Sequence, residues 1–184
     1  EIEEAALKKE KDQLSQEHLK EIQKELVTIE WDAEAAEKGG YEHFMIKEIH
    51  EQPRAVRDTL NSIIRDGHID LTEAGLSDDV IRSLKRIYIV ACGSAYHAGV
   101  AAQYVIEDLA RIPVRELASE FRYRNPILEE NSLVIIISQS GETADSLAAL
   151  RLAKSQGVPT MAIVNVVGST IAREADHIFY TLAG

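Results

Sequence analysis

The second half of the chain alternates short apolar runs with helical segments, and this alternation constrains the fold more than any other feature. The runs IYIVA (87–91) and LVIII (133–137) are apolar or aromatic at every position. A strand that is apolar on both faces must be covered by helices on both faces, as in a parallel sheet. Helical patterns at 95–110 and 143–157 follow these runs. We therefore predict an α/β fold, with a doubly wound parallel sheet of about five strands over residues 86–184.

Three further runs complete the predicted sheet, and short helical turns separate them. The runs IPVRELA, PTMAIVN and HIFYTL occupy residues 112–118, 159–165 and 177–182. Helical turns are expected around SEFRYR (119–124) and STIAREA (169–175). Strands that alternate with helices pair in parallel through right-handed crossovers, so the loops into the helices gather at one edge of the sheet.

Residues 1–30 differ from the rest of the chain. They are dominated by Glu, Lys and Gln, with a narrow apolar stripe at Leu14, Ile22 and Leu26. One such stripe cannot build a core by itself, so we expect a charged linker or helical extension. The sequence KGG (38–40) breaks this segment.

Residues 31–85 are predicted to form a helical lead-in that packs on the sheet. Apolar residues at helical spacing begin at Tyr41, and we expect this helix to end before Pro53, which disfavours helical geometry in its preceding residue. Pro53 suits the first position of a new helix, which DGH (66–68) should stop. A further short helix follows, with Ser77 as its N-cap.

The chain is acidic, with a formal net charge of −11 and a pI near 5.0. It lacks the basic excess that binds nucleic acid or an anionic membrane surface, so we expect neither partner. A single cysteine excludes an internal disulfide framework and fits a reducing compartment. The sequence shows no apolar run long enough to span a membrane and no signal-peptide pattern, and we expect a soluble cytoplasmic protein.

Two loops of unusual composition follow strands of the predicted sheet, ACGSAYHAG (91–99) and SQSGETADS (138–146). Open parallel sheets bind ligands at such strand ends. Two loops rich in small and hydroxyl residues at one edge are hard to explain as helix caps alone. Gly93 and Gly99 lack the spacing of a dinucleotide fingerprint, which argues against a dinucleotide site.

The second loop offers neutral hydrogen-bond donors at the start of a helix. Ser138, Ser140 and Thr143 supply hydroxyls, Gln139 supplies an amide, and Gly141 lets the backbone turn tightly. The first amides of the following helix have no partners within it and favour an anion. The pattern therefore predicts phosphate binding without lysine. The alternative is a capping motif with Ser140 as the N-cap.

Other residues are weaker candidates for function. The histidines show no ligand spacing with Cys or carboxylates, so we expect neither a metal nor a cofactor. Cys92 follows a buried strand with no histidine base placed beside it by sequence, and a core role is favoured over that of a nucleophile. His97 is interpreted as a helix-surface residue, and Arg122 and Arg124 as solvated side chains.

Five stretches together resemble the sugar isomerase (SIS) domain family, and more narrowly the isomerase portion of the glutamine–fructose-6-phosphate aminotransferase family. They are EKGGYEHFMIKEIHEQPRAVRDTL, IYIVACGSAYHAG, ASEFRYRNP, SQSGETADSLAALRLAK and NVVGSTIAREAD. The resemblance covers roughly residues 29–184. The stretch HFMIKEIHEQP separates this family from simpler SIS proteins.

The resemblance implies roles for residues of both loops. In the family, the SQSGET stretch wraps the phosphate of fructose 6-phosphate, and a CGTS loop adds contacts. Here that loop reads CGSA, so Ala95 lacks a hydroxyl that some members aim at the phosphate. The phosphate-binding residues implied are Ser138, Gln139, Ser140, Thr143 and Ser94, with Cys92, Gly93 and Gly141 in the substrate loops.

The resemblance also implies the reaction of the whole protein. Enzymes of the aminotransferase family that this chain resembles transfer ammonia from glutamine to fructose 6-phosphate and form glucosamine 6-phosphate, which is the first step of hexosamine synthesis. The family's glutaminase domain and second SIS half, which holds its acid–base residues, have no counterpart in this sequence. We therefore expect no catalytic residue in this chain, weak binding of hexose 6-phosphates, no turnover by the chain alone, and a homodimer. Two alternatives stay open, a regulatory SIS module that senses a sugar phosphate and a stand-alone sugar-phosphate isomerase.

Overall fold

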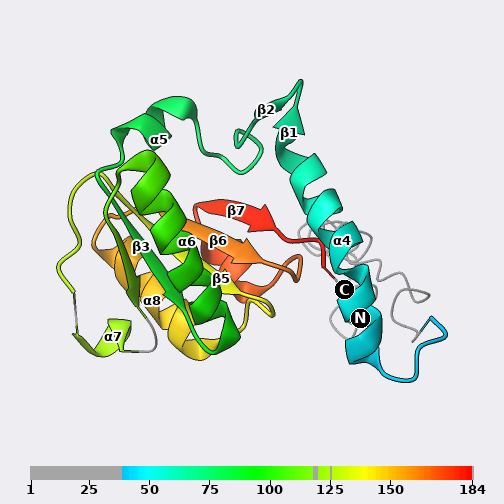
Figure 1. Ribbon diagram of the computed structural model, residues 1–184. Coiled ribbons are helices and arrows are strands. Elements are labelled where there is room, and N and C mark those ends of the chain that lie inside the picture. The colour runs from blue at the N-terminus through cyan, green and yellow to red at the C-terminus, as the bar shows by residue number, and fades with distance from the viewer. Residues whose placement is uncertain (1–38, 118–119, 125, 184) are drawn as a thin grey trace, which may run out of the picture. The chain divides into compact units, whose positions relative to one another are not determined.

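The computed structural model describes residues 39–117, 120–124 and 126–183 (Figure 1). The chain divides into two units, residues 1–47 and 48–184. The expected charged extension over residues 1–30 lies outside the described residues. In the first unit, Gly39 and Gly40 adopt positive φ angles in a turn that precedes helix α4 (Phe44–Ile63).

The described part of the second unit contains a five-stranded parallel sheet (Figure 1). The strands are β3 (Arg86–Ala91), β4 (Val114–Leu117), β5 (Ser132–Ser138), β6 (Thr160–Val164) and β7 (His177–Tyr180). They lie in the order β4-β3-β5-β6-β7, and each neighbouring pair is parallel. The predicted α/β class and doubly wound sheet are confirmed.

The two faces of the sheet pack against different helices, because successive side chains of a strand point to opposite sides. On one face, Ile89 lies in a cluster with Ile106 of helix α6 (Ser94–Ala110). On the other face, Val134 lies in a cluster with Leu150 of helix α8 (Ala144–Ser155). Val134 and Leu150 are fully buried. Burial of one such side chain stabilises a fold by about 1.5–3 kcal/mol, so both apolar faces contribute to stability.

The described part of the second unit also contains three shorter helices, α5 (Asp78–Ser83), α7 (Phe121–Arg124) and α9 (Thr170–Glu174). The predicted cap of α5 is confirmed, since the Ser77 hydroxyl accepts a hydrogen bond from the amide of Val80 at 3.4 Å. Helix α5 packs on the sheet through Val80 and Ile81, which cluster with Leu133. Packing of the whole lead-in (31–85) on the sheet stays a prediction.

Asp176 joins helix α8 to the start of strand β6. One of its carboxylate oxygens accepts hydrogen bonds from the Thr160 amide and hydroxyl at 3.0 and 2.7 Å, and Lys154 Nζ lies 2.6 Å from the other. Burial alone would raise the pKa of Asp176, but the hydrogen bonds from Lys154 and Thr160 outweigh it and lower that pKa. The carboxylate therefore stays charged in the folded protein at neutral pH.

Helix α4 runs through Pro53, where the sequence predicts a boundary between two helices, and that prediction is wrong. A proline removes one hydrogen bond of the helix and disfavours, without forbidding, helical geometry before it. Pro53 and Ile49, four residues earlier, are both exposed. Water can therefore reach the carbonyl group that Pro53 leaves without its helical partner, which reduces the cost of continuing the helix.

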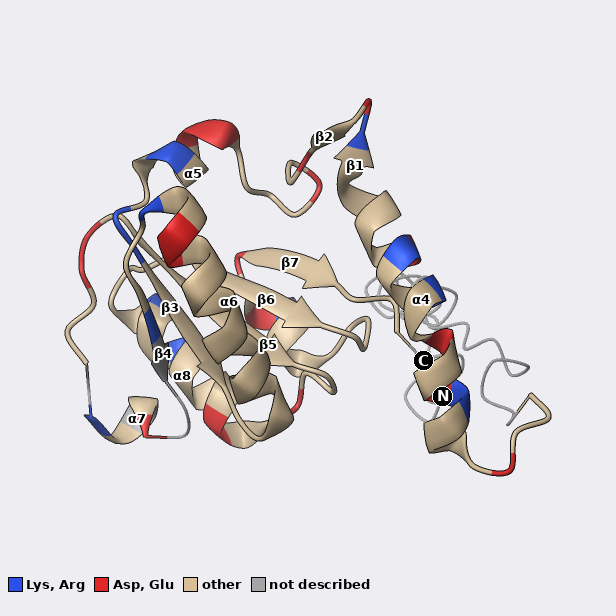
Figure 2. Cartoon of the chain, viewed as in Figure 1, with Lys and Arg blue, Asp and Glu red and all other residues tan. Residues whose placement is uncertain are grey.

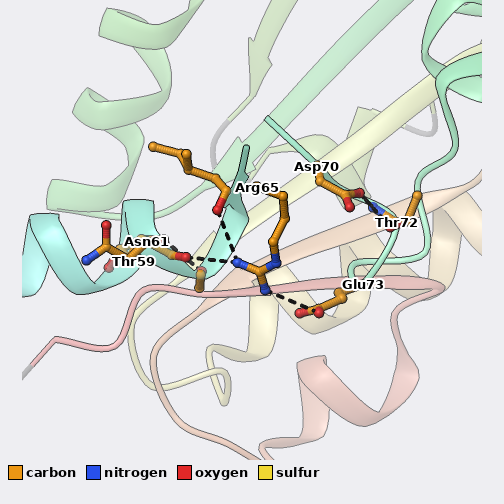
Figure 3. Close-up of polar contacts among 8 residues, drawn as sticks. Thr59, Asn61, Arg65, Asp70, Thr72 and Glu73 are labelled. Atoms are coloured by element: carbon orange, nitrogen blue, oxygen red, sulfur yellow. Dashed lines mark hydrogen bonds and ion pairs between the residues drawn. The ribbon is translucent and has the colours of Figure 1, made fainter. Parts of the chain in front are cut away.

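A small antiparallel hairpin follows α4, and the sequence interpretation missed it. Strands β1 (Ile64–Arg65) and β2 (His68–Ile69) pair across Asp66 and Gly67, which both have positive φ. An Asp-Gly pair with this geometry is typical of a tight hairpin turn. In Figure 3, the Arg65 guanidinium donates to the carbonyl of Asn61 at 3.0 Å and to the Glu73 carboxylate at 3.2 Å, which ties the hairpin to its neighbours.

Candidate functional site

The strand order favours the ends of β3 and β5 as the location of a candidate ligand site. The chain passes from β3 to β4 on one side and later returns to β5 on the other side of β3. Ligands of open parallel sheets bind where the order reverses in this way. Both loops singled out by the sequence follow these two strands, so the fold brings them to the same edge of the sheet.

The SQSGET loop (138–143) is organised around the hydroxyl of Ser138. This buried side chain accepts a hydrogen bond from the Gly141 amide at 3.1 Å and lies 3.1 Å from the hydroxyl of Thr143. The Ser140 hydroxyl accepts from the Glu142 amide at 3.3 Å. These bonds close the loop on itself, whereas Gln139 and Ser140 are exposed at its tip.

The start of helix α8 differs from the capping motif that was the alternative interpretation of this loop. The N-cap is Thr143 instead of Ser140, and its side chain makes no capping hydrogen bond. Its hydroxyl is directed to Ser138, at 3.1 Å. The first amides of α8 are therefore left without a side-chain cap from Thr143, as an anion-binding helix start requires.

A second segment (165–171) supports the SQSGET loop from the side of strand β6. The amides of Asn165 and Ile171 donate to the carbonyls of Gln139 and Gly141 at 3.1 and 3.0 Å. Gly141 has φ of +66°, and a Cβ built on it would lie 2.0 Å from Ser169 Oγ. Only glycine fits this position, because the turn needs positive φ and the neighbouring segment leaves no room.

Glu142 adds a side-chain contact between the same two segments. Its carboxylate accepts a hydrogen bond from the backbone amide of Thr170 at 2.7 Å. The hydrogen bond from the Thr170 backbone amide, followed by one from the Thr170 side chain, lowers the pKa of Glu142. The charged form is therefore favoured although this loop is a candidate anion site.

The first loop enters helix α6 through Gly93, which is the N-cap and has φ of +61°. Ser94 is the first residue of the helix and is exposed. The thiol of Cys92 lies 3.9 Å from the hydroxyl of Ser146 in the first turn of α8, so it links the two loops. The ring of His97 packs edge-on against Tyr96, with ring centroids 5.6 Å apart.

A cavity of about 490 Å³ opens between the two loops and helix α4. Of the predicted phosphate-binding residues, Ser94, Ser138 and Gln139 line it. Ser140 and Thr143 are not among the lining residues, nor are Cys92, Gly93 and Gly141. Apart from residues of helix α4, the other lining residues come from the start of α6, from β5, from β6 and the residue after it, and from the segment after β7, and they are Ala95, Ile137, Ile163, Val164, Asn165, Thr181 and Ala183.

The sequence interpretation missed one wall of this cavity, which helix α4 supplies. The wall consists of Glu48, Glu51, Gln52 and Ala55. These residues follow the spacing i, i+3, i+4, i+7, which places them on one face of a helix. The sequence therefore indicated that these residues share one face of a helix, but it could not show which other segments that face packs against.

The segment after β7 closes another side of the cavity. The Asn165 side chain accepts from the Thr181 hydroxyl at 2.9 Å and from the Ala183 amide at 2.7 Å. The Thr59 hydroxyl of α4 donates to the carbonyl of Thr181. Asn165 and Thr59 therefore hold this segment beside the cavity.

No lysine or arginine occurs in the two loops, where the charged residues are Glu142 and Asp145 (Figure 2). Within the described residues, no group of three His, Cys, Asp or Glu side chains is arranged to hold a metal ion. Likewise, none of the helices in the described ranges is long and apolar enough to cross a membrane. The arrangement offers neutral donors on one wall of the cavity and carboxylates on another.

Comparisons with known proteins agree with the fold described above. The SIS domain family matches residues 80–184. Glutamine–fructose-6-phosphate aminotransferase (isomerizing) of Clostridium acetobutylicum is 62% identical over 165 residues, 89% of this chain and 27% of that protein. The same enzyme of Caldanaerobacter subterraneus is 59% identical over 167 residues, 90% of this chain and 28% of that protein. This chain thus spans little more than a quarter of these relatives.

A solved structure extends the similarity to the fold. The C-terminal domain of glucosamine-fructose-6-phosphate aminotransferase from Francisella tularensis superposes with a TM-score of 0.75 at 45% identity. The match covers 80% of this chain and 42% of that one. At this identity, the likeness reaches beyond the fold alone.

Proposed function

Since this chain belongs to the SIS-domain family, we propose that its cavity binds the phosphate group of a hexose 6-phosphate. The ligand in question is fructose 6-phosphate or its product glucosamine 6-phosphate. The whole protein would be a glutamine-dependent aminotransferase that makes glucosamine 6-phosphate, because the relatives named above carry that activity in their names. The two open alternatives, a sensing module and a stand-alone isomerase, are less favoured, because the relatives at 62% and 59% identity carry the aminotransferase name.

The observation that carries the proposal is the meeting of two donor loops at one cavity. Ser94 comes from the loop after β3, and Ser138 and Gln139 come from the loop after β5. A phosphate monoester needs several donors around one group of oxygens, and hydrogen bonds to a charged group contribute about 1.5–3 kcal/mol each. Donors from two loops and from the start of α8 can meet that need without a cation.

The other wall of the cavity suits the sugar. Glu48, Glu51 and Gln52 present oxygen acceptors, and the hydroxyls of a sugar are hydrogen-bond donors. A volume of about 490 Å³ lies within the range of small-molecule sites. A hexose phosphate would therefore place its phosphate against the serine-rich loops and its ring toward α4.

In this proposal the chain holds the substrate and does not transform it. Binding a phosphate remote from the reacting carbons positions those carbons for the chemistry. The acid–base groups would come from parts of the protein beyond this chain, together with the glutaminase activity. We expect a homodimer and no turnover by the chain alone, to be checked by sedimentation and by an assay for glucosamine 6-phosphate.

The test is a titration of the 184-residue chain with fructose 6-phosphate, in which calorimetry or NMR detects binding. We expect weak, saturable binding of fructose 6-phosphate, weaker binding of inorganic phosphate, and no binding of fructose. Equal affinity for fructose and fructose 6-phosphate, or absence of binding by both, would contradict the proposal.

A matched pair of serines makes the test specific to the site. Ser94→Ala removes a hydroxyl from the cavity wall, and we expect it to weaken binding roughly fivefold. Ser155→Ala removes an exposed hydroxyl at the far end of α8, where it donates to Leu152, and should leave affinity unchanged. Equal effects of the two substitutions would place the binding site elsewhere.

A further inference from the structure

The SQSGET loop is anchored to the segment 165–171 by hydrogen bonds at three of its positions, 139, 141 and 142. The carbonyls of Gln139 and Gly141 accept from backbone amides, and the carboxylate of Glu142 accepts from Thr170. The first two of these contacts join backbone groups, whereas the hydrogen bond that Thr170 donates to Glu142 depends on a side chain of the loop. It is therefore the contact that a substitution in the loop can remove while the fold is kept.

A carboxylate in this position is unexpected for an anion site. A negative charge beside a bound phosphate lowers the affinity for that phosphate. Glu142 is exposed, so a neutral residue could stand at this position in contact with solvent. The charge is offset by a short hydrogen bond, 2.7 Å from the Thr170 amide. The pairing indicates that the fixed position of the loop matters more than the local charge.

We propose that Glu142 is a positioning residue that holds the SQSGET loop in its phosphate-binding shape through the backbone amide of Thr170. The inference rests on the function proposed above. Glu142 does not line the cavity, so it acts through its neighbours Ser140 and Thr143 and the backbone between them. A loop fixed before binding loses less freedom when the ligand arrives, and affinity rises accordingly.

Two substitutions separate positioning from charge, because the two roles predict opposite results. Glu142→Gln removes the charge and keeps an oxygen that can accept from Thr170, whereas Glu142→Ala removes both. If Glu142 acts only as a charge, both variants bind fructose 6-phosphate equally and up to about threefold more tightly at low salt. If it positions the loop, Glu142→Ala binds about fivefold more weakly and Glu142→Gln stays within about twofold of the unmodified chain.

The donor can be removed independently, because Thr170 is the first residue of helix α9. Proline is well tolerated at that position, and the extended backbone of Ser169 (φ −62°, ψ 159°) suits the residue before a proline. Thr170→Pro deletes the amide donor, and Thr170→Ala keeps it while removing the hydroxyl. We expect Thr170→Pro to match Glu142→Ala in affinity, Thr170→Ala to lose less, and the double variant Glu142→Ala/Thr170→Pro to add little to either.

The experiment measures by calorimetry the fructose 6-phosphate affinity of each variant of the 184-residue chain, with thermal unfolding to compare stability. Selective weakening in Glu142→Ala and Thr170→Pro, with retention in Glu142→Gln, supports the inference. Equal affinities of Glu142→Ala and Glu142→Gln, equal losses in Thr170→Pro and Thr170→Ala, or additive losses in the double variant overturn it. Failure of the unmodified chain to bind fructose 6-phosphate overturns the proposed function and this inference with it, so the two failures are distinguishable.

Discussion

Replacing Gly141 with alanine tests whether the SQSGET loop is shaped by steric contact with the segment 165–171. Gly141 has φ of +66°, a region that costs an L-residue about 1–2 kcal/mol. A Cβ at this position would lie 2.0 Å from Ser169 Oγ and 2.5 Å from Ser169 Cβ. A rotation of the serine side chain can move Oγ, but Cβ is fixed to the backbone. The overlap must therefore be relieved by a backbone shift.

The expected loss of stability has two parts that a control can separate. Overlap in a packed site costs typically about 1–3 kcal/mol, so Gly141→Ala should lower the free energy of unfolding by about 2–5 kcal/mol in total. Gly157 has a similar φ of +73°, and no heavy atom lies within 4 Å of a Cβ built on it. Gly157→Ala should therefore cost about 1–2 kcal/mol, the conformational part alone.

The assay is urea unfolding followed by circular dichroism, with fructose 6-phosphate binding measured on the same samples. Adding Ser169→Gly to Gly141→Ala removes both overlapping atoms and should recover the overlap part, less a few tenths of a kcal/mol for the changed helix cap. A Gly141→Ala variant no less stable than Gly157→Ala would refute the reasoning. So would a Ser169→Gly substitution that recovers nothing.

Three further predictions concern other parts of the fold. Asp176→Asn should lower the free energy of unfolding by about 1–2 kcal/mol through its bonds to Thr160, measured by urea unfolding. Because folding lowers the pKa of Asp176, this contribution is complete above its unfolded value of about 3.9 and disappears as the pH falls through the folded pKa. Pro53→Ala should raise the free energy of unfolding by about 1–2 kcal/mol by restoring a helical hydrogen bond; a lower thermal midpoint would contradict this. Cys92→Ala should leave fructose 6-phosphate affinity within about twofold, because the thiol makes only a weak contact with Ser146, and loss of binding would assign it a larger role.

The sheet could be predicted from the sequence because its signal is local. Strands β3 and β5 are apolar on both faces, as at Val134 and its neighbours, and only helices on both sides can cover such strands. The N-cap at Ser77 is local in the same sense, since its hydroxyl and the amide it accepts are three residues apart. The hairpin at Asp66 and Gly67 also carried a local signal, which was interpreted only as a helix stop.

The candidate site was predictable only in part, because its walls meet through contacts between distant segments. The two donor loops could be placed at one edge once a parallel sheet was assumed. Glu48 and Glu51 reach the same cavity as Ser94 only through the path of the chain between them, which no periodicity encodes. The distinction between a cap and an anion site was likewise beyond the sequence, since it depends on where the hydroxyl of Thr143 points.

Among the described residues that line the cavity there is no Lys or Arg, so anion binding there depends on the shape of the loop. A lysine can hold a phosphate from many positions because its charge acts over distance, whereas neutral donors must sit within hydrogen-bond distance and direction of the oxygens. A site made of hydroxyls and amides therefore needs its backbone fixed beforehand. The three bonds to the segment 165–171 and the close contact of Gly141 with Ser169 supply that fixation. On this argument the carboxylate of Glu142, unfavourable as a charge, is explained by the shape it maintains.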